Sequence, residues 1–230
     1  MPASVAKRSG QVQRSTLDLM GLRPSNSRML TGILLIVGGY LLGSVACAVV
    51  VCRAMGMPDP RVGGSGNPGA TNVLRLHGRA AAVLTLAGDT LKGLIPVFVA
   101  RELDSADWLV AATGAAAFTG HIYPVFFAFR GGKGVATLVG VLLGIHWALG
   151  AAFVAIWLVT AALFRYSSLA ALTAAVLTPV FAWLLLPGTV YVAALTGLAG
   201  VLMWRHRSNI RNLIRGQEEK IQLGSKSPAG

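Results

Sequence analysis

Two glycine-rich runs contain the residues of this 230-residue chain that are best suited to chemistry. The first covers residues 63–72 and holds Ser65 and Asn67 among four glycines. The second covers residues 130–134 and reads Arg-Gly-Gly-Lys-Gly. Glycine lets backbone N–H groups approach an anion closely, while lysine or arginine supplies the countercharge. Both runs therefore predict contact with molecules that carry phosphate.

Each run leads into an expected helix, whose N-terminal dipole would favour a bound anion. The first helix would place Asn72 and Arg75 on one side, with Arg79 on the same face as Arg75. The second would begin near Val135, just after Lys133. Because Lys133 is followed by glycine instead of Ser or Thr, the second run is not a Walker A loop. We expect Arg75 and Lys133 to contact phosphate.

A third basic segment, residues 205–211, leaves the last apolar stretch of the chain. Charge alone would make it an anchor beside the membrane. His206 and Asn209 are three residues apart, so on a helix they would point the same way. His206 could donate to phosphate or move a proton. Gly216 and Glu218 close this region.

The titratable residues Asp89, Lys92 and His121 lie within apolar stretches. Asp89 and Lys92 are three residues apart, so they are expected to pair with each other, and a role toward substrate is the alternative. His121 lies near the end of the next apolar stretch, where we expect a packed histidine at a helix end.

The composition predicts a membrane protein, because 54% of the residues are hydrophobic and only 12% are charged. The net charge of +12 comes from basic residues that flank apolar stretches, which favours anionic lipid as a partner over nucleic acid. Cys47 and Cys52 would lie about 140° apart on a helix, so no disulfide is expected. No His-Glu-x-x-His pattern occurs, and we expect neither a metal nor a cofactor.

Apolar stretches of the length needed to cross a bilayer recur along the chain. The stretch 134–164 is too long for one helix and too short for two full spans, and residues 146–150 could form a turn between two short helices. Splitting it gives seven spans, and leaving it whole gives six. The expected spans are 29–52, 80–100, 106–129, the two halves of 134–164, 167–186 and 189–204.

The distribution of basic residues favours seven spans. With the split, thirteen Lys and Arg residues face the cytoplasm, in 53–79, 130–133, 165–168 and the segment from 205 onward. The five basic residues of the N-terminal tail oppose this orientation. We therefore expect an all-α integral membrane protein of seven transmembrane helices with cytoplasmic glycine-rich loops. Residues 1–28 would be a disordered polar tail, 29–222 the membrane domain and 223–230 a C-terminal tail.

Three motifs make the sequence resemble the acyl-phosphate-dependent glycerol-3-phosphate acyltransferases, the PlsY family. These motifs are residues 64–75, residues 120–126 followed by 131–137, and residues 205–210 with Gly216 and Glu218. Residues 165–169 are also similar to that family, and the match runs in order over roughly residues 30–222. Pro68, where the family often has Ile, and Gln217 depart from its pattern.

The resemblance implies an enzyme of the bacterial inner membrane with a cytoplasmic active site. It would transfer a fatty acyl group from acyl phosphate to the sn-1 hydroxyl of glycerol 3-phosphate, giving lysophosphatidic acid and phosphate. Membrane lipids and other enzymes of phospholipid synthesis are further expected partners. By motif position, the catalytic residues would be Ser65, Lys133, His206 and Asn209. The substrate-binding residues would be Gly64, Gly66, Asn67, Asn72, Arg75, Gly132, Gly134, Ser168, Gly216 and Glu218.

Other functions remain open to the sequence. Intramembrane charges and broken helices would suit an anion transporter, although no inverted repeat is apparent. An acyl-CoA-dependent acyltransferase is a second alternative, but no histidine here begins a His-x-x-x-x-Asp pattern. The repeated aspartates of CDP-alcohol phosphotransferases are absent. No Ser-His-Asp triad is evident either, so catalysis would rest on positioning and on stabilisation of negative charge.

Overall fold

A computed structural model describes residues 26–103 and 105–221 of the chain. The described residues divide into two units between Leu35 and Ile36, and the site discussed below belongs entirely to the second. The expected tail 223–230 lies outside the described residues, as does the expected tail 1–28 except for residues 26–28. Those three residues already belong to the first helix of the described part, which begins earlier than the expected span at residue 29.

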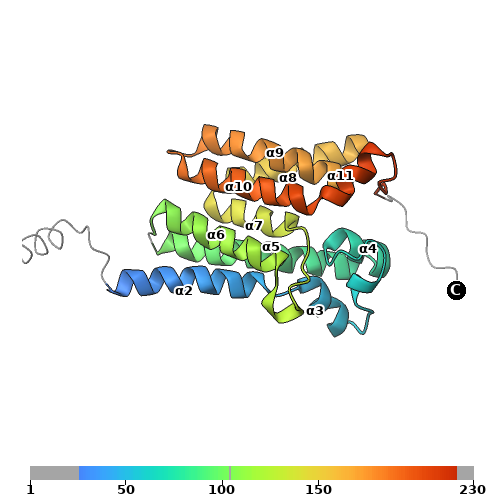
Figure 1. Ribbon diagram of the computed structural model, residues 1–230, viewed down its shortest axis with the longest axis horizontal. Coiled ribbons are helices and arrows are strands. Elements are labelled where there is room, and N and C mark those ends of the chain that lie inside the picture. The colour runs from blue at the N-terminus through green and yellow to red at the C-terminus, as the bar shows by residue number, and fades with distance from the viewer. Residues whose placement is uncertain (1–25, 104, 222–230) are drawn as a thin grey trace, which may run out of the picture. The chain divides into compact units, whose positions relative to one another are not determined.

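The described residues form helices and no strand. The helices are α2 (Asn26–Gly43), α3 (Cys47–Ala54), α4 (Ala70–His77), α5 (Arg79–Glu102), α6 (Asp107–Ile122), α7 (Val135–Ile145), α8 (Trp147–Phe164), α9 (Ser167–Leu185), α10 (Val190–Arg205) and α11 (Arg207–Ile214). Two short 3₁₀ turns, η1 (Pro60–Val62) and η2 (Val125–Phe127), lie between them. Within the second unit, the helices from α5 to α10 run side by side, and the short helices α3, α4 and α11 gather at one end (Figure 1).

Five of the described segments are long and apolar enough to cross a membrane by length and composition. They are α2, α5, α6 together with η2, α8 and α9. The helices α7 and α10 are also apolar but shorter. An all-helical apolar fold is therefore confirmed. The eleven residues of α7 are fewer than a spanning helix needs, because crossing a bilayer takes about 20.

Two breaks in the apolar stretches set the helix boundaries. The expected span 29–52 is wrong as a single helix, because α2 ends at Gly43 and α3 begins at Cys47. In the gap, the backbone carbonyl of Val45 accepts a hydrogen bond from Lys92. The predicted break of 134–164 is confirmed at His146, whose Nδ1 accepts a hydrogen bond from the first turn of α8.

The helices α5 and α7 touch through their backbones. A Cβ atom at Gly93 of α5 would strike the carbonyl oxygen of Thr137, and one at Gly140 of α7 would strike that of Thr90. Small residues of this kind allow two apolar helices to approach closely. This packing fixes α7, and with it the glycine-rich run that precedes α7, against the centre of the helical unit.

The expectation that Arg75 and Arg79 share a helix face is wrong. The helix α4 ends at His77, and Gly78 follows with φ +85°. The chain changes direction there, and Arg79 becomes the first residue of α5. A positive φ is accessible to glycine because it has no side chain, so Gly78 is the residue that separates the two arginines.

Candidate phosphate-binding site

The side chain of Asn72 shapes the first glycine-rich loop from within. Asn72 is only 2% exposed, and its Nδ2 donates to the carbonyl oxygens of Pro60 and Gly63 at 2.9 and 3.1 Å. Its Oδ1 accepts a hydrogen bond of 3.0 Å from the N–H of Ser65. A Cβ atom at Gly64, where φ is +56°, would strike that Oδ1. Asn72 was expected to bind substrate, but its amide is committed to the loop, so we infer a positioning role.

Two residues hold the second glycine-rich loop, His121 through its backbone carbonyl and Arg205 through its side chain. The N–H of Gly132 donates to the carbonyl of His121 at the end of α6, at 3.2 Å. From α10, the guanidinium of Arg205 donates to the carbonyls of Gly131 and Gly132 at 3.1 Å each. Arg205, which charge alone would make a membrane anchor, therefore shapes the loop. The loop's peptide groups are fixed just before Lys133.

Lys133 lies half-buried at the start of α7. Burial lowers the pKa of its ammonium group, and the nearby carboxylate of Glu218 acts in the opposite direction. The Nζ atom donates to Oδ1 of Asn209 at 2.5 Å. The following residue, Gly134, has φ +89°, and a Cβ atom there would strike the ring of Phe118. Only glycine therefore fits between Lys133 and the helix.

A chain of hydrogen bonds continues from Lys133 across three elements. Asn209 in α11 donates from Nδ2 to Oε1 of Glu218 at 2.7 Å. The hydroxyl of Ser168, in the first turn of α9, donates to the same carboxylate oxygen at 2.6 Å. Lys133, Asn209, Glu218 and Ser168, all predicted as site residues, are thus brought together.

Gly216 turns the chain so that Glu218 can join this network. It lies just beyond α11 with φ +67°. Its N–H donates to the carbonyl of Leu213, and the N–H of Gln217 donates to that of Asn212. These two bonds form a Schellman motif, which ends a helix with glycine in the left-handed region. Gly216 was expected to bind substrate, and we infer that it positions Glu218 instead.

His206 is buried at the junction between α10 and α11. The helix does not run straight from His206 to Asn209, because His206 caps α10 and α11 begins at Arg207. Its ring is 3% exposed, and Nδ1 lies 2.9 Å from the carbonyl of Leu202. Burial lowers the pKa of His206 to about 4. The imidazole is therefore neutral at pH 7 and adds no positive charge to the site.

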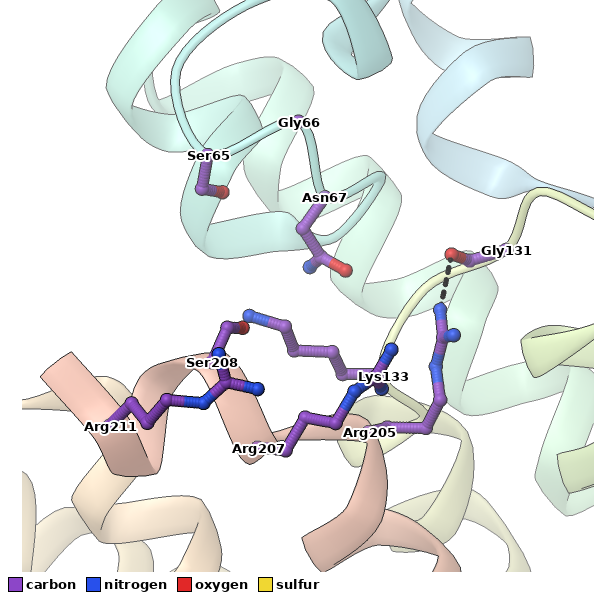
Figure 2. A pocket seen from close by; sticks show the side chains of 9 residues that line it. All are labelled: Ser65, Gly66, Asn67, Gly131, Lys133, Arg205, Arg207, Ser208 and Arg211. Carbon is purple, nitrogen blue, oxygen red and sulfur yellow. Dashed lines mark hydrogen bonds between the residues drawn. The ribbon is translucent and has the colours of Figure 1, made fainter.

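The first glycine-rich loop and the basic segments face each other across a cavity of about 370 Å³. Ser65, Gly66 and Asn67 lie on one side (Figure 2). The cations of Lys133, Arg205, Arg207 and Arg211 lie on the other, and Arg205 reaches Gly131. No carboxylate lines this cavity among the described residues. Four cations with no internal anion make it suited to a dianion such as phosphate.

A second cavity of about 320 Å³ holds Arg75. It is lined by Arg75 from α4, by Arg165 between α8 and α9, and by residues 219–221. Arg75 forms an ion pair of 2.7 Å with Glu219. Arg165 fixes the end of the described chain, because its carbonyl accepts from the N–H of Ile221 and its guanidinium donates to the carbonyl of Ile221. Arg75 and Lys133 thus line two different cavities.

Sequence reasoning missed several residues of these cavities. Arg207 and Arg211 were absent from the predicted site, although their four-residue spacing places both on one face of α11. Glu219 was also missed, and no local pattern indicates its pairing with Arg75. His206, which was predicted, lines neither of the two cavities described here.

Comparison with known proteins identifies the family. The family profile described as glycerol-3-phosphate acyltransferase matches residues 33–216. A glycerol-3-phosphate acyltransferase of Thioalkalivibrio sulfidiphilus is 57% identical over 193 residues, which is 84% of this chain and 95% of the relative.

Two solved structures share the fold. One is PlsY (YgiH), an integral membrane glycerol 3-phosphate acyltransferase, in its glycerol 3-phosphate form, with a TM-score of 0.80 and 36% identity over 84% of this chain and 96% of that one. The other is the lysophosphatidic acid form, with a TM-score of 0.78 and 35% identity over 83% of this chain and 95% of that one. The match over most of its length shows that the chain belongs to the glycerol-3-phosphate acyltransferase family.

Proposed function

We propose that this protein transfers a fatty acyl group from acyl phosphate to the sn-1 hydroxyl of glycerol 3-phosphate. The products are lysophosphatidic acid and inorganic phosphate. The observation that carries the proposal is the pair of basic cavities, one around Lys133 and one around Arg75. The hydrogen-bond chain from Lys133 reaches Glu218, and the next residue, Glu219, lines the second cavity. Two linked anion sites match a reaction whose two substrates both carry phosphate.

We assign acyl phosphate to the cavity around Lys133. Lys133 lies just before α7, whose eleven residues contain only apolar side chains, glycine and one buried threonine. A phosphate at Lys133 can therefore keep its acyl chain among apolar helices. The solved PlsY structures are described as glycerol 3-phosphate and lysophosphatidic acid forms, which supports these ligand classes for the site.

We assign glycerol 3-phosphate to the cavity around Arg75. This cavity is built from the end of the short helix α4, from Arg165 and from the polar segment 219–221. A soluble, doubly charged substrate suits such a polar lining. Arg75 and Arg165 would then bind the phosphate and direct the glycerol hydroxyls toward the Lys133 cavity.

The chemistry requires positioning more than activation, because an acyl phosphate already has a good leaving group. The sn-1 hydroxyl oxygen attacks the acyl carbonyl carbon, the bond from that carbon to the phosphate oxygen breaks, and phosphate leaves. Lys133 and the backbone N–H groups of its loop stabilise the negative charge that develops on phosphate.

The hydroxyl proton must also be accepted. With a pKa of about 4, His206 is a weaker base than a phosphate monoester, whose second pKa is about 6. We therefore propose that phosphate takes the proton. His206 would serve as a neutral buried residue at the junction of α10 and α11.

We further propose that α2 and α5 to α10 make seven crossings, with both cavities on the cytoplasmic side. The positive-inside rule supports this orientation, since α4 and α11, which carry basic residues of the two cavities, gather at the same end of the helical unit (Figure 1). The loop before the short helix α7 would lie below the membrane surface. Irregular backbone is tolerated at that depth where other parts of the protein satisfy its polar groups. Here the His121 carbonyl and the Arg205 side chain make hydrogen bonds to the loop.

The decisive assay uses purified protein in lipid with glycerol 3-phosphate and either acyl phosphate or acyl-CoA, each with EDTA present. We expect lysophosphatidic acid from acyl phosphate alone. The two cavities, of about 370 and 320 Å³, are lined mainly by glycine, polar and basic residues, which suits small phosphate groups. Equal turnover with acyl-CoA, or anion flux without acyl transfer, would overturn the proposal.

A further inference from the structure

Asp89, Lys92 and His121 form a buried cluster that no step above uses. Their side chains are 2%, 3% and 6% exposed. Lys92 Nζ lies 2.8 Å from Asp89 Oδ1, and His121 Nδ1 lies 3.6 Å from the same oxygen. Charged groups inside a membrane protein are costly, and pairing alone rarely repays the cost of burying them. The cluster therefore calls for a role beyond stability.

Two residues of the cluster, Lys92 and His121, make hydrogen bonds near helix ends, Lys92 in the break between α2 and α3 and His121 at the end of α6. Lys92 donates at 2.6 Å to the carbonyl of Val45, in the break between α2 and α3. At the other end, the backbone carbonyl of His121, not its ring, accepts from the N–H of Gly132. The ring of His121 also fills the space beside Gly132, because a Cβ atom at Gly132 would strike its Nε2. The cluster thus reaches the loop that carries Lys133.

Arg205 contacts the same loop from the other side. It binds the carbonyls of Gly131 and Gly132, while the His121 ring lies against Gly132. The two contacts together clamp the loop between α6 and α10. Of the two, only His121 lies beside a buried ion pair, that of Asp89 with Lys92, and its Nδ1 is 3.6 Å from the Asp89 oxygen.

We propose that the Asp89–Lys92–His121 cluster is a positioning device that fixes loop 131–134, and so the cation of Lys133, at the first cavity. His121 is the positioning residue that contacts the loop, and Asp89 and Lys92 hold its ring. The inference rests on the proposed role of Lys133 in binding acyl phosphate. Its consequence is that residues remote from the substrate set the substrate's affinity.

The first test replaces His121 with alanine and reads the loop directly. We expect faster amide hydrogen exchange in a peptide covering residues 130–136, with no change in a peptide from α11. We also expect a higher KM for acyl phosphate and a lower kcat, together about ten- to a hundredfold in kcat/KM, because small displacements of a catalytic group have effects of this size. His146→Ala, at the cap of α8, is the matched control.

A merely structural role would give a different result. Loss of folded protein would lower the apparent kcat and leave the KM of the remaining enzyme unchanged. Unchanged exchange in residues 130–136 would overturn the inference even if activity fell. If the loop loosens in the variant but the wild-type protein makes no lysophosphatidic acid, the positioning role stands and the proposed function fails.

A second test changes the other side of the contact, Gly132, and combines that change with His121→Ala. Gly132 is not among the glycines with positive φ, so its backbone conformation allows alanine. The obstacle to alanine there is the His121 ring, which the added Cβ atom would strike. We expect Gly132→Ala to raise the KM for acyl phosphate, and His121→Ala to relieve part of that rise in the double variant by removing the clash. Strictly additive effects on kcat/KM would show that the ring does not set the loop.

Discussion

Arg75 Nη2 lies 2.7 Å from Glu219 Oε2, so a carboxylate of the chain itself pairs with the guanidinium group that we propose to bind glycerol 3-phosphate. The Glu219 side chain is 69% exposed and can move away without uncovering a core. A phosphate that enters this cavity must displace it. Glu219 would therefore act as an internal competitor of the substrate.

Replacing Glu219 with Gln should lower the KM for glycerol 3-phosphate by about 1.4- to 5-fold, because exposed ion pairs contribute about 0.2–1 kcal/mol. The gain should shrink at high salt, which screens the pair already. Initial rates at varied glycerol 3-phosphate measure it. Glu102→Gln, which removes an exposed partner of Arg101, is the control.

Variants of Arg75 test the other half of this ion pair. Arg75→Ala should raise the KM for glycerol 3-phosphate more than Leu74→Ala does, since only Arg75 lines the cavity. In the Arg75→Ala background, Glu219→Gln should have no further effect on KM. An undiminished effect there would show that Glu219 acts through another group.

Lys133→Ala should nearly abolish turnover while leaving thermal unfolding close to that of the wild type. Each hydrogen bond to a charged group is worth about 1.5–3 kcal/mol, or about ten- to a hundredfold in rate. Lys133→Arg should rescue only part, because a planar fork replaces a point charge next to Asn209. Arg130→Ala changes an exposed cation of the same run and should have little effect. Wild-type activity in Lys133→Ala would reduce Lys133 to a membrane anchor.

Local signals made part of this fold predictable. The helices that begin at Ala70 and Val135 follow glycine-rich runs, and the break at His146 interrupts an apolar stretch of unusual length. The pairing of Asp89 with Lys92 follows from three-residue spacing on one helix. In each case the information lies within a few residues of the feature.

Long-range contacts made the rest unpredictable from one sequence. The break after Gly43 includes a carbonyl that Lys92 satisfies from another helix. Asn72 was expected to bind substrate, yet its amide group makes hydrogen bonds to Pro60 and Ser65 in the preceding loop, which folds back beside it. The placement of Arg75 and Lys133 in separate cavities depends on how α4, α7 and α11 pack, which residue spacing does not encode.

The proposed topology predicts which face of the membrane exposes the two loops. Cysteines introduced in place of Ser65 and Arg130 should react with impermeant thiol reagents only from the cytoplasmic side. Native Cys47 is partly buried and Cys52 is buried, so a variant lacking both provides the background. Labelling of either new cysteine from outside intact cells would contradict a cytoplasmic site. A cysteine at Arg101, at the opposite end of α5, should show the reverse pattern and serves as the control.

His206 should make the folded protein sensitive to acid between pH 6.5 and about 4. Burial lowers its pKa from 6.5 to about 4, so within this window the unfolded chain binds a proton that the folded protein excludes. The free energy of unfolding is therefore fully retained above pH 6.5 and falls as the pH drops, by up to about 1.4 kcal/mol per pH unit. His206→Asn keeps a group able to donate to the Leu202 carbonyl but does not titrate, so its stability should vary less with pH across this window. Thermal unfolding in detergent from pH 4.5 to 8, with His146→Asn as the matched control, measures the difference. Equal pH dependence in the wild type and His206→Asn would mean that the imidazole is already accessible to protons in the folded state.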